Sequence, residues 1–185
     1  STIARCGGGS GSGVDCVGCH AGLVARNLFE QLLGNAVQAK GGSADLELRW
    51  NRLVSAGQRA FNLGGSTGFA FFRPPLSTTV PNAEARNLRA IGNLIVGGDT
   101  PFAFVGCVDC VAAHNTVVNP ATWLMRILQE TTSGGGFTFE PAANGQVVNN
   151  LVHCADGDIS PHVNIGPNTA PATFDFAHDL WFAWD

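Results

Sequence analysis

The sequence is poor in charged residues and contains no long apolar run. Charged residues make up 13% of its 185 residues and the formal net charge is −4, which argues against a general binder of nucleic acid or of anionic membranes. No segment approaches the roughly 20 consecutive apolar residues of a transmembrane helix, and none has the pattern of a signal peptide. The composition therefore predicts a protein with no nucleic-acid partner and no membrane partner.

Cysteine is also sparse, and the glycines follow no collagen-like period. Six cysteines permit disulfides but are too few for a scaffold built on them. The 24 glycines indicate many tight turns rather than a triple helix. With 45% apolar residues the chain is expected to fold around a core. The even number of cysteines favours an extracellular or periplasmic location.

What the sequence does contain is an internal repeat centred on a polar residue. Each repeated position is an asparagine or aspartate that is followed two residues later by a large apolar residue. Alternating pairs such as Leu46/Leu48 precede these positions, and further upstream lie pairs such as Phe102/Phe104; both are typical of short strands with alternate residues buried. The repeated polar positions are Asn27, Asn51, Asn93, Asn115, Asn150 and Asp179.

Three short strands per repeat and a recurring polar corner predict an all-β fold, a parallel β-solenoid of about six coils. Each coil leaves strand edges that only the next coil can satisfy, so the coils should stack about 4.8 Å apart. The corner amides should then bond to one another as an asparagine ladder. The alternative is a β-sandwich with unrelated turn asparagines, but sandwich strands are antiparallel and would not repeat a three-strand pattern.

Loops interrupt this repeat at three places. Residues 1–13 are rich in glycine and serine and are expected to form a loosely packed lead, and residues 14–185 a single domain. Insertions are expected at 69–85, 130–144 and 154–161, and such insertions are candidates for the walls of a groove.

The segments HNTVVNP and VVNNLV resemble the coil corners of the right-handed parallel β-helix family, which includes pectate lyases and the alginate and chondroitin lyases. The resemblance runs from about Val14 to the C-terminus and implies a right-handed β-helix. This fold hosts lyases, hydrolases, epimerases and inert adhesins, so the corner motifs specify the fold better than the reaction.

The register of the repeat also predicts which polar residues point outward. If the alternating apolar residues of the upstream strands face the core, the residues between them form an outward ribbon. A rigid ribbon of amides and charges suits a hydroxyl-rich chain, so a polysaccharide is the predicted partner. The predicted substrate-binding residues are Asp15, Gln38, Asn62, Glu130 and Arg73.

The segment AVQAKGGS resembles the lysine strand of the alginate and chondroitin lyases. The resemblance implies that Lys40 is the base in a β-elimination on a uronate-containing chain, with an arginine that stabilises charge. The next coil, RAFNLGGS, has no arginine at the matching place, so Arg126 is the predicted partner, with Arg59 or Arg73 as substitutes. Ca²⁺ could neutralise the substrate carboxylate, although no ligand set is evident. The alternative for Lys40 is an ordinary solvated surface charge.

The cysteines raise two cofactor hypotheses. Cys16 to His20 spell CVGCH, the attachment motif of c-type haem, but the repeat places Cys16 in an inward column. Haem is therefore disfavoured relative to buried thiols or a local disulfide. Cys107 and Cys110 could join Cys16 and Cys19 in a zinc site, but about three coils, or roughly 14 Å, separate the two pairs.

Other function classes remain open or are disfavoured. No GxSxG elbow, P-loop or dinucleotide-binding fingerprint is present. The carboxylates do not group on adjacent coils, so glycoside hydrolysis ranks below β-elimination. The main alternative to a glycan-binding protein is a structural solenoid that associates end to end into a filament, because the sequence shows no obvious polar caps.

Overall fold

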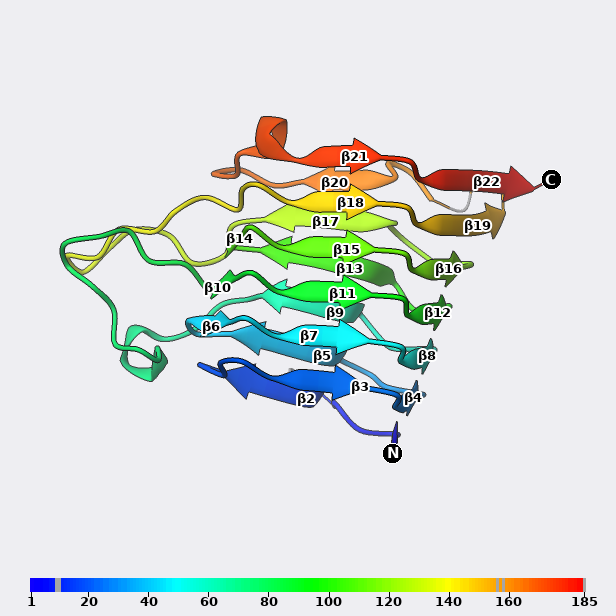
Figure 1. Cartoon of the computed structure of the whole chain (residues 1–185), viewed down its shortest axis with the longest axis horizontal. Helices are drawn as coiled ribbons and strands as arrows, with labels where there is room; N and C mark the ends of the chain where they lie inside the picture. The colour runs from blue at the N-terminus through cyan, green and yellow to red at the C-terminus, as the bar shows by residue number, and fades with distance from the viewer. Residues whose placement is uncertain (9–10, 156, 158, 185) are drawn as a thin grey trace.

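The computed structural model describes residues 1–8, 11–155, 157 and 159–184, and nearly all of its regular structure is β-strand (Figure 1). Sheet 1 contains β2 (Ser12–Val17), β5 (Asn35–Lys40), β9 (Arg59–Gly64), β13 (Thr100–Val105), β17 (Met125–Leu128) and β20 (Val163–Ile165). Sheet 2 contains β3 (Leu23–Ala25), β7 (Glu47–Arg49), β11 (Arg89–Ile91), β15 (Val111–Ala113), β18 (Gln146–Val148) and β21 (Asp175–Ala177). Sheet 3 contains β1 (Thr2–Ala4), β4 (Leu28–Glu30), β8 (Arg52–Val54), β12 (Leu94–Val96), β16 (Thr116–Val118), β19 (Leu151–Ala155) and β22 (Leu180–Trp184).

Smaller elements lie between the sheets. A narrow fourth sheet contains β6 (Ser43–Ala44), β10 (Ala85–Arg86) and β14 (Cys107–Val108). Two short 3₁₀ turns, η1 (Phe69–Phe71) and η2 (Pro171–Thr173), are the helical elements of the described chain. Among the described residues, no helix has the length and apolar character needed to cross a membrane.

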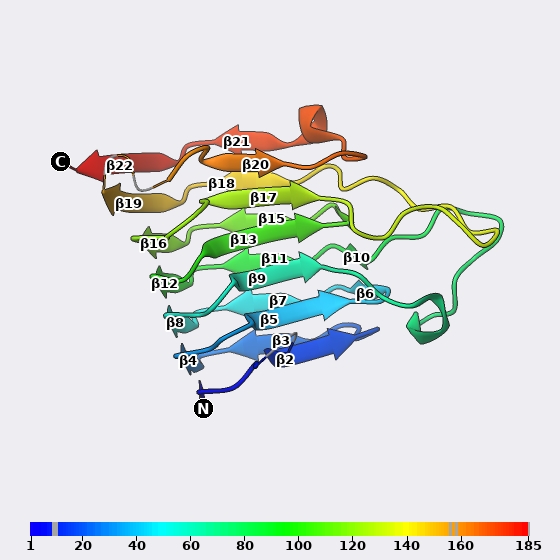
Figure 2. The same ribbon diagram turned by 180° about the vertical axis from the view of Figure 1, so that it is seen from behind.

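The strands of each sheet run parallel, and the chain visits the sheets in a fixed order. In one circuit it passes through sheets 1, 2 and 3 and then returns to the neighbouring strand of sheet 1 (Figures 1 and 2). The register of sheet 1 aligns Asp15, Gln38, Asn62, Ala103 and Arg126 in one column. The prediction of an all-β protein with parallel sheets is confirmed, and the antiparallel sandwich is wrong.

The corner between sheets 2 and 3 combines a left-handed backbone with a chain of amide hydrogen bonds. The residue before each corner position has positive φ, for example 55° at Trp50 and 56° at His114. Asn51 Nδ2 donates to Asn93 Oδ1 at 3.1 Å, and Asn93 Nδ2 donates to Asn115 Oδ1 at 3.0 Å. Left-handed backbone costs a non-glycine residue roughly 1–2 kcal/mol, and these buried hydrogen bonds offset that cost.

The core lies inside the three sheets and is built from the inward residue of each strand. Phe61 and Phe102, on neighbouring strands of sheet 1, stack with their ring centroids 6.2 Å apart. Leu53 and Ile95 fill the same role on sheet 3, and Leu48 on sheet 2. All five side chains are fully buried, as the alternation in the sequence predicts.

The two long insertions pack against each other and project from one end of sheet 1 (Figures 1 and 2). The Asn82 N–H donates to the Thr138 carbonyl at 2.8 Å, and Arg86 pairs with Glu140 at 2.7 Å. The Phe69 ring lies 5.8 Å from that of Phe139. The insertions at 69–85 and 130–144 therefore form one lobe beside the sheet.

The N-terminal lead differs from the expectation. Residues Thr2–Ala4 form β1, which pairs with β4, and β2 already begins at Ser12. Thr2–Ala4 and Ser12 are part of the edges of sheets 3 and 1, because they pair with β4 and β5. Residues 9 and 10 of the lead, and residues 156 and 158 of the predicted insertion at 154–161, lie outside the described residues.

Candidate functional site

The outer face of sheet 1 carries a connected row of polar side chains. Gln38 Nε2 donates to Asp15 Oδ1 at 3.1 Å, and Asn62 Nδ2 donates to Gln38 Oε1 at 2.6 Å. Gln38 and Asn62 are nevertheless only 6% and 1% exposed. Both amides are predicted substrate-binding residues, and in the structure they hydrogen-bond to neighbouring side chains. They form a buried polar floor, and Asp15 lies exposed at its edge.

Arg59 connects this floor to the lobe. One terminal nitrogen donates to Asn62 Oδ1 at 3.0 Å and the other to Glu130 Oε1, also at 3.0 Å. The Arg59 side chain is only 16% exposed, so its orientation is fixed by both partners. Glu130, the first residue of the second insertion, is thereby held at the edge of the sheet.

Lys40 stands on the opposite side of the same floor, at the end of β5. Its Nζ donates to the Ser66 carbonyl at 3.4 Å, and its aliphatic stem passes over Gly65. A Cβ atom at Gly65 would lie 3.1 Å from Lys40 Cδ, and Gly65 has φ of +155°. The backbone conformation therefore favours glycine at position 65, and a Cβ atom there would also crowd the lysine stem.

These residues surround a hollow of about 210 Å³, called here the polar groove. It places the two cations Lys40 and Arg59 around an amide floor, with Glu130 at one wall. Cations and amides in one hollow can bind carboxylates and hydroxyl groups. The groove is lined by Gly11, Gly34, Asn35, Gln38, Lys40, Gln58, Arg59, Ser66 and Glu130.

Arg126 lies beyond the far side of the groove. Its Nε donates to Asn164 Oδ1 at 3.0 Å, and its guanidinium lies 4.2 Å from the centre of the Trp123 ring. Burial lowers the pKa of Arg126, and the nearby Arg59 cation lowers it further, while Glu130 opposes the shift. Strand β17 is three strands from β5, or roughly 14 Å between backbones, and Arg126 is close enough to Arg59 and Glu130 for their charges to affect it.

Arg73 lies outside the groove. Its guanidinium donates to the carbonyls of Ala70 and Phe72, at 3.1 and 2.7 Å, within its own loop. Its carbonyl oxygen contacts His20 Nε2 at 3.0 Å. The predicted substrate-binding role of Arg73 is therefore not supported by its position, because the loop folds back on itself. Arg59, which the sequence offers only as a substitute, is the arginine that lines the same hollow as Lys40.

Glu84 is a buried polar residue that the sequence did not reveal. It is 0% exposed, and its carboxylate accepts hydrogen bonds from the Gly41 and Thr67 N–H groups at 2.9 and 2.8 Å. The hydroxyl groups of Thr67 and Thr131 donate to it as well. Glu84 follows a proline-rich loop without a period, so no sequence pattern places it in the interior.

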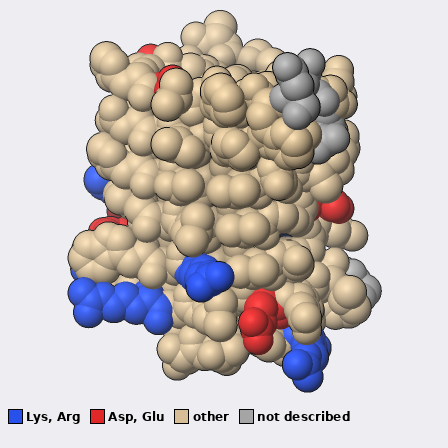
Figure 3. Space-filling view, turned by 90° about the vertical axis from the view of Figure 1, so that its right-hand side faces the viewer, with Lys and Arg blue, Asp and Glu red and all other residues tan. Residues whose placement is uncertain are grey.

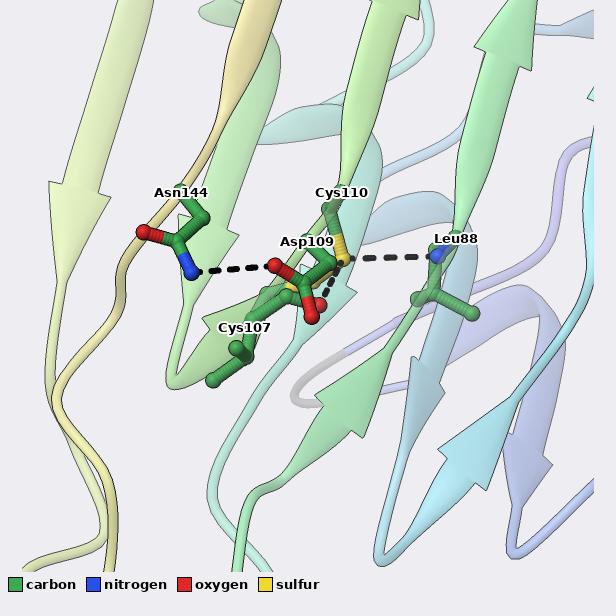
Figure 4. Close-up of a disulfide and its surroundings, with 6 residues drawn as sticks. Leu88, Cys107, Asp109, Cys110 and Asn144 are labelled. Carbon is green, nitrogen blue, oxygen red and sulfur yellow. Dashed lines mark hydrogen bonds between the residues drawn. A yellow bond between two sulfur atoms is a disulfide. The ribbon is translucent and has the colours of Figure 1, made fainter. Parts of the chain in front are cut away.

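The cysteine pairs do not form a metal site in the described structure. Cys107 and Cys110 form a disulfide that closes the turn after β14 (Figure 4). Asn144 Nδ2 donates to Asp109 Oδ1 in this turn at 3.0 Å (Figure 4). Across the described residues, no three His, Cys, Asp or Glu side chains group so that they could hold a metal ion.

The chain matches no protein-family model, no curated protein and no solved structure. The observations that bear on function are therefore the polar groove and the exposed side chains of the last circuit. The resemblance of the corner segments and of the Lys40 strand to polysaccharide lyases remains a prediction.

Proposed function

We propose that the chain is a right-handed parallel β-helix of six coils whose polar groove binds an anionic polysaccharide outside the cell or in the periplasm. The repeated circuit through three parallel sheets supports the solenoid. The hydrogen bonds from Asn27 through Asn51, Asn93 and Asn115 to Asn150 support an asparagine ladder at its corner.

The observation that carries the binding proposal is the position of Lys40 and Arg59 in one hollow. Their side chains stand on a rigid sheet, and Arg59 is fixed by Asn62 and Glu130. A carboxylate placed between the two cations gains charge-assisted hydrogen bonds, and the nearby Gln58 and Ser66 suit sugar hydroxyls. A uronate-containing chain combines both groups.

The same arrangement supports β-elimination as the reaction. The Lys40 amine takes the proton from the carbon next to the uronate carboxyl group, while Arg59 stabilises the charge that develops on that group. The electron pair forms the new carbon–carbon double bond, and the glycosidic oxygen leaves and takes up a proton. In this proposal Arg59 replaces Arg126 as the arginine of the reaction.

The test is the ultraviolet absorbance of the unsaturated product on a set of uronate polymers. Lys40→Ala should abolish the absorbance increase, and Arg73→Ala, outside the groove, should leave it unchanged. Activity that survives Lys40→Ala contradicts the lyase mechanism. Polymer binding without any absorbance increase supports a binding protein that does not cleave its ligand.

A second candidate function is end-to-end association, and the last circuit favours it. Leu180 and Phe182 of β22 are 60% and 54% exposed, and Trp181 and Trp184 are 39% and 42% exposed. Strand β22 pairs only with β19 among the described strands, so its outer backbone edge is also open. An apolar surface next to an open edge suits a further parallel strand, as in a stacked copy of the same chain. Sedimentation at increasing concentration tests this, and a monomer at all concentrations contradicts it.

A further inference from the structure

The first cysteine pair has the same local turn as the pair that forms the disulfide. Both turns have the sequence Cys-Val-X-Cys, and in each the first cysteine and the valine end a strand, β2 or β14. The third residue has positive φ in both, 68° at Gly18 and 58° at Asp109. Such a turn folds the chain back within four residues, and at Cys107 and Cys110 it leaves the Cα atoms 6.2 Å apart.

The side chains of Cys16 and Cys19 already meet. Their thiols lie close enough to interact, and both pack against the core while staying partly exposed. Ser43 holds the turn from the next circuit, because its hydroxyl accepts from the Cys19 N–H at 3.0 Å. The hydroxyl donates to the Lys40 carbonyl at 2.7 Å and lies 3.4 Å from the Cys16 carbonyl oxygen. The backbone of the turn and the contact between the thiols therefore both favour a bond between the two sulfur atoms.

We infer that Cys16 and Cys19 form a second disulfide when the protein meets an oxidising thiol–disulfide environment. The two thiols lose two protons and two electrons, and the acceptor is a small disulfide such as oxidised glutathione, which is reduced to two thiols. The Cys19 thiolate attacks that disulfide and releases the first glutathione. Cys16 then attacks the Cys19 sulfur, gives up its proton and releases the second.

The order of these steps follows from the surroundings of Cys16. Burial, followed by the contact with Cys19, raises the pKa of the Cys16 thiol to about 12. Cys16 is therefore protonated at neutral pH and is the later of the two thiols to react. Closure of the turn should accordingly become faster as the pH rises toward 12.

The disulfide would secure the outermost strand of sheet 1. Strand β2 pairs only with β5 among the described strands, whereas β14 lies inside the stack of circuits. The bridge also uses both sulfur atoms that a c-type haem would need for its thioether bonds. CVGCH is on this account a structural turn and not an attachment site.

Alkylation followed by tryptic peptide mapping tests the inference on the whole protein. Cleavage after arginine places Cys6, Cys16 and Cys19 on the peptide 6–26, and Cys107 and Cys110 alone on 90–126. The protein is incubated with oxidised glutathione, denatured without reductant and alkylated. Peptide 6–26 should then carry one alkyl group, located on Cys6 by fragmentation, and 90–126 should carry none. After reduction, every cysteine in both peptides should be alkylated.

The variant Cys6→Ser excludes pairing with Cys6, and its peptide should change from no alkyl group to two on reduction. Two alkyl groups on Cys16 and Cys19 after oxidation, while 90–126 stays closed, would overturn the inference. A bridge from Cys6 to either residue, or a peptide that carries the mass of haem, would overturn it as well. The result does not depend on glycan binding, so the proposed function and this inference can fail separately.

Discussion

At the scale of single residues, Glu84 holds together parts of the chain that are distant in sequence. Its carboxylate accepts from Gly41 at the end of sheet 1 and from Thr67 at the start of the lobe. It also accepts from the hydroxyl of Thr131, which belongs to the second insertion. The Glu84 N–H donates to the Gly106 carbonyl at 3.1 Å. A fully buried carboxylate is costly unless it is hydrogen-bonded, and here each oxygen has two donors.

Replacement of this carboxylate should be strongly destabilising. In Glu84→Gln the side-chain NH₂ group must face at least one backbone N–H, which leaves buried donors without an acceptor. The expected loss in the free energy of unfolding is on the order of 3 kcal/mol, measured by urea denaturation. Glu140→Gln is the matched control, since its exposed pair with Arg86 should cost less than about 1 kcal/mol. Equal losses for the two variants would contradict the role given to Glu84.

At the scale of elements, the corner asparagines repeat one hydrogen-bond pattern in successive circuits. Asn93 Nδ2 donates to the Leu48 carbonyl and Asn115 Nδ2 to the Ala90 carbonyl, both at 2.9 Å, in addition to the next rung. Asp179 ends the series: its Oδ1 accepts from Asn150 Nδ2 at 2.9 Å. Within the described part of the chain, Asp179 Oδ2 is buried without a hydrogen-bond partner.

The pattern predicts that Asp179→Asn stabilises the protein. The side-chain NH₂ group of each corner asparagine from Asn51 to Asn150 donates to a backbone carbonyl in the preceding circuit, three residues before that circuit's corner asparagine. For position 179 the corresponding carbonyl is that of Val147. The new NH₂ group should make this bond and replace the unpaired oxygen, with a gain of about 1 kcal/mol in the free energy of unfolding. Asp175→Asn, exposed on the same circuit, is the control and should change it little. A loss of stability in Asp179→Asn would show that the corner needs the carboxylate.

Replacement of a buried corner asparagine inside the series should destabilise the protein strongly. In the unmodified chain, the Asn51 N–H donates to Asn93 Oδ1 at 2.9 Å, and Asn93 Nδ2 donates to the Leu48 carbonyl. In Asn93→Leu the N–H of Asn51 therefore loses its acceptor and the Leu48 carbonyl loses its donor. The expected cost is on the order of 3 kcal/mol in chemical denaturation, and Asn27→Leu at the partly buried first rung should cost clearly less. Similar costs at both positions would argue against a ladder that acts through burial.

The parallel strands and their inward columns could be predicted from the sequence because they follow a local period. The spacing of Phe102/Phe104 and of the corner asparagines predicts which residues of neighbouring strands pair. The structure has the same pairing. The contact between Arg59 and Glu130 could not be predicted, because Glu130 belongs to an insertion that lies 71 residues further along the chain. The same holds for Arg73, whose direction is set by the fold of its loop and not by any repeat.

At the scale of the whole molecule, charge and apolar surface are unevenly distributed. The outer face of sheet 3 carries its Lys and Arg side chains mainly at the end of the first circuits, and the rest of this face has few charges (Figure 3). The large exposed apolar side chains Leu180, Phe182 and Trp184 lie on β22, at the opposite end. The two ends of the molecule therefore differ in chemistry.

If the last circuit mediates association, a charge placed there should prevent it. Phe182→Lys should shift the protein toward monomer at a concentration where the unmodified chain associates, because an ammonium group in an apolar contact is costly. Leu33→Lys, at an exposed leucine elsewhere, should leave association unchanged. Light scattering after gel filtration measures both, and an equal effect of the two variants would show that the association is not specific to this end.

Calorimetric titration with uronate oligosaccharides of different linkage tests the claim that the polar groove recognises an anionic glycan. At least one oligosaccharide should bind, more weakly at high salt, because Lys40 and Arg59 attract its carboxylates. Lys40→Gln should weaken that binding tenfold or more, and Arg73→Gln should not change it. Binding that is unaffected by Lys40→Gln, or equal binding of neutral and acidic oligosaccharides, would contradict the claim.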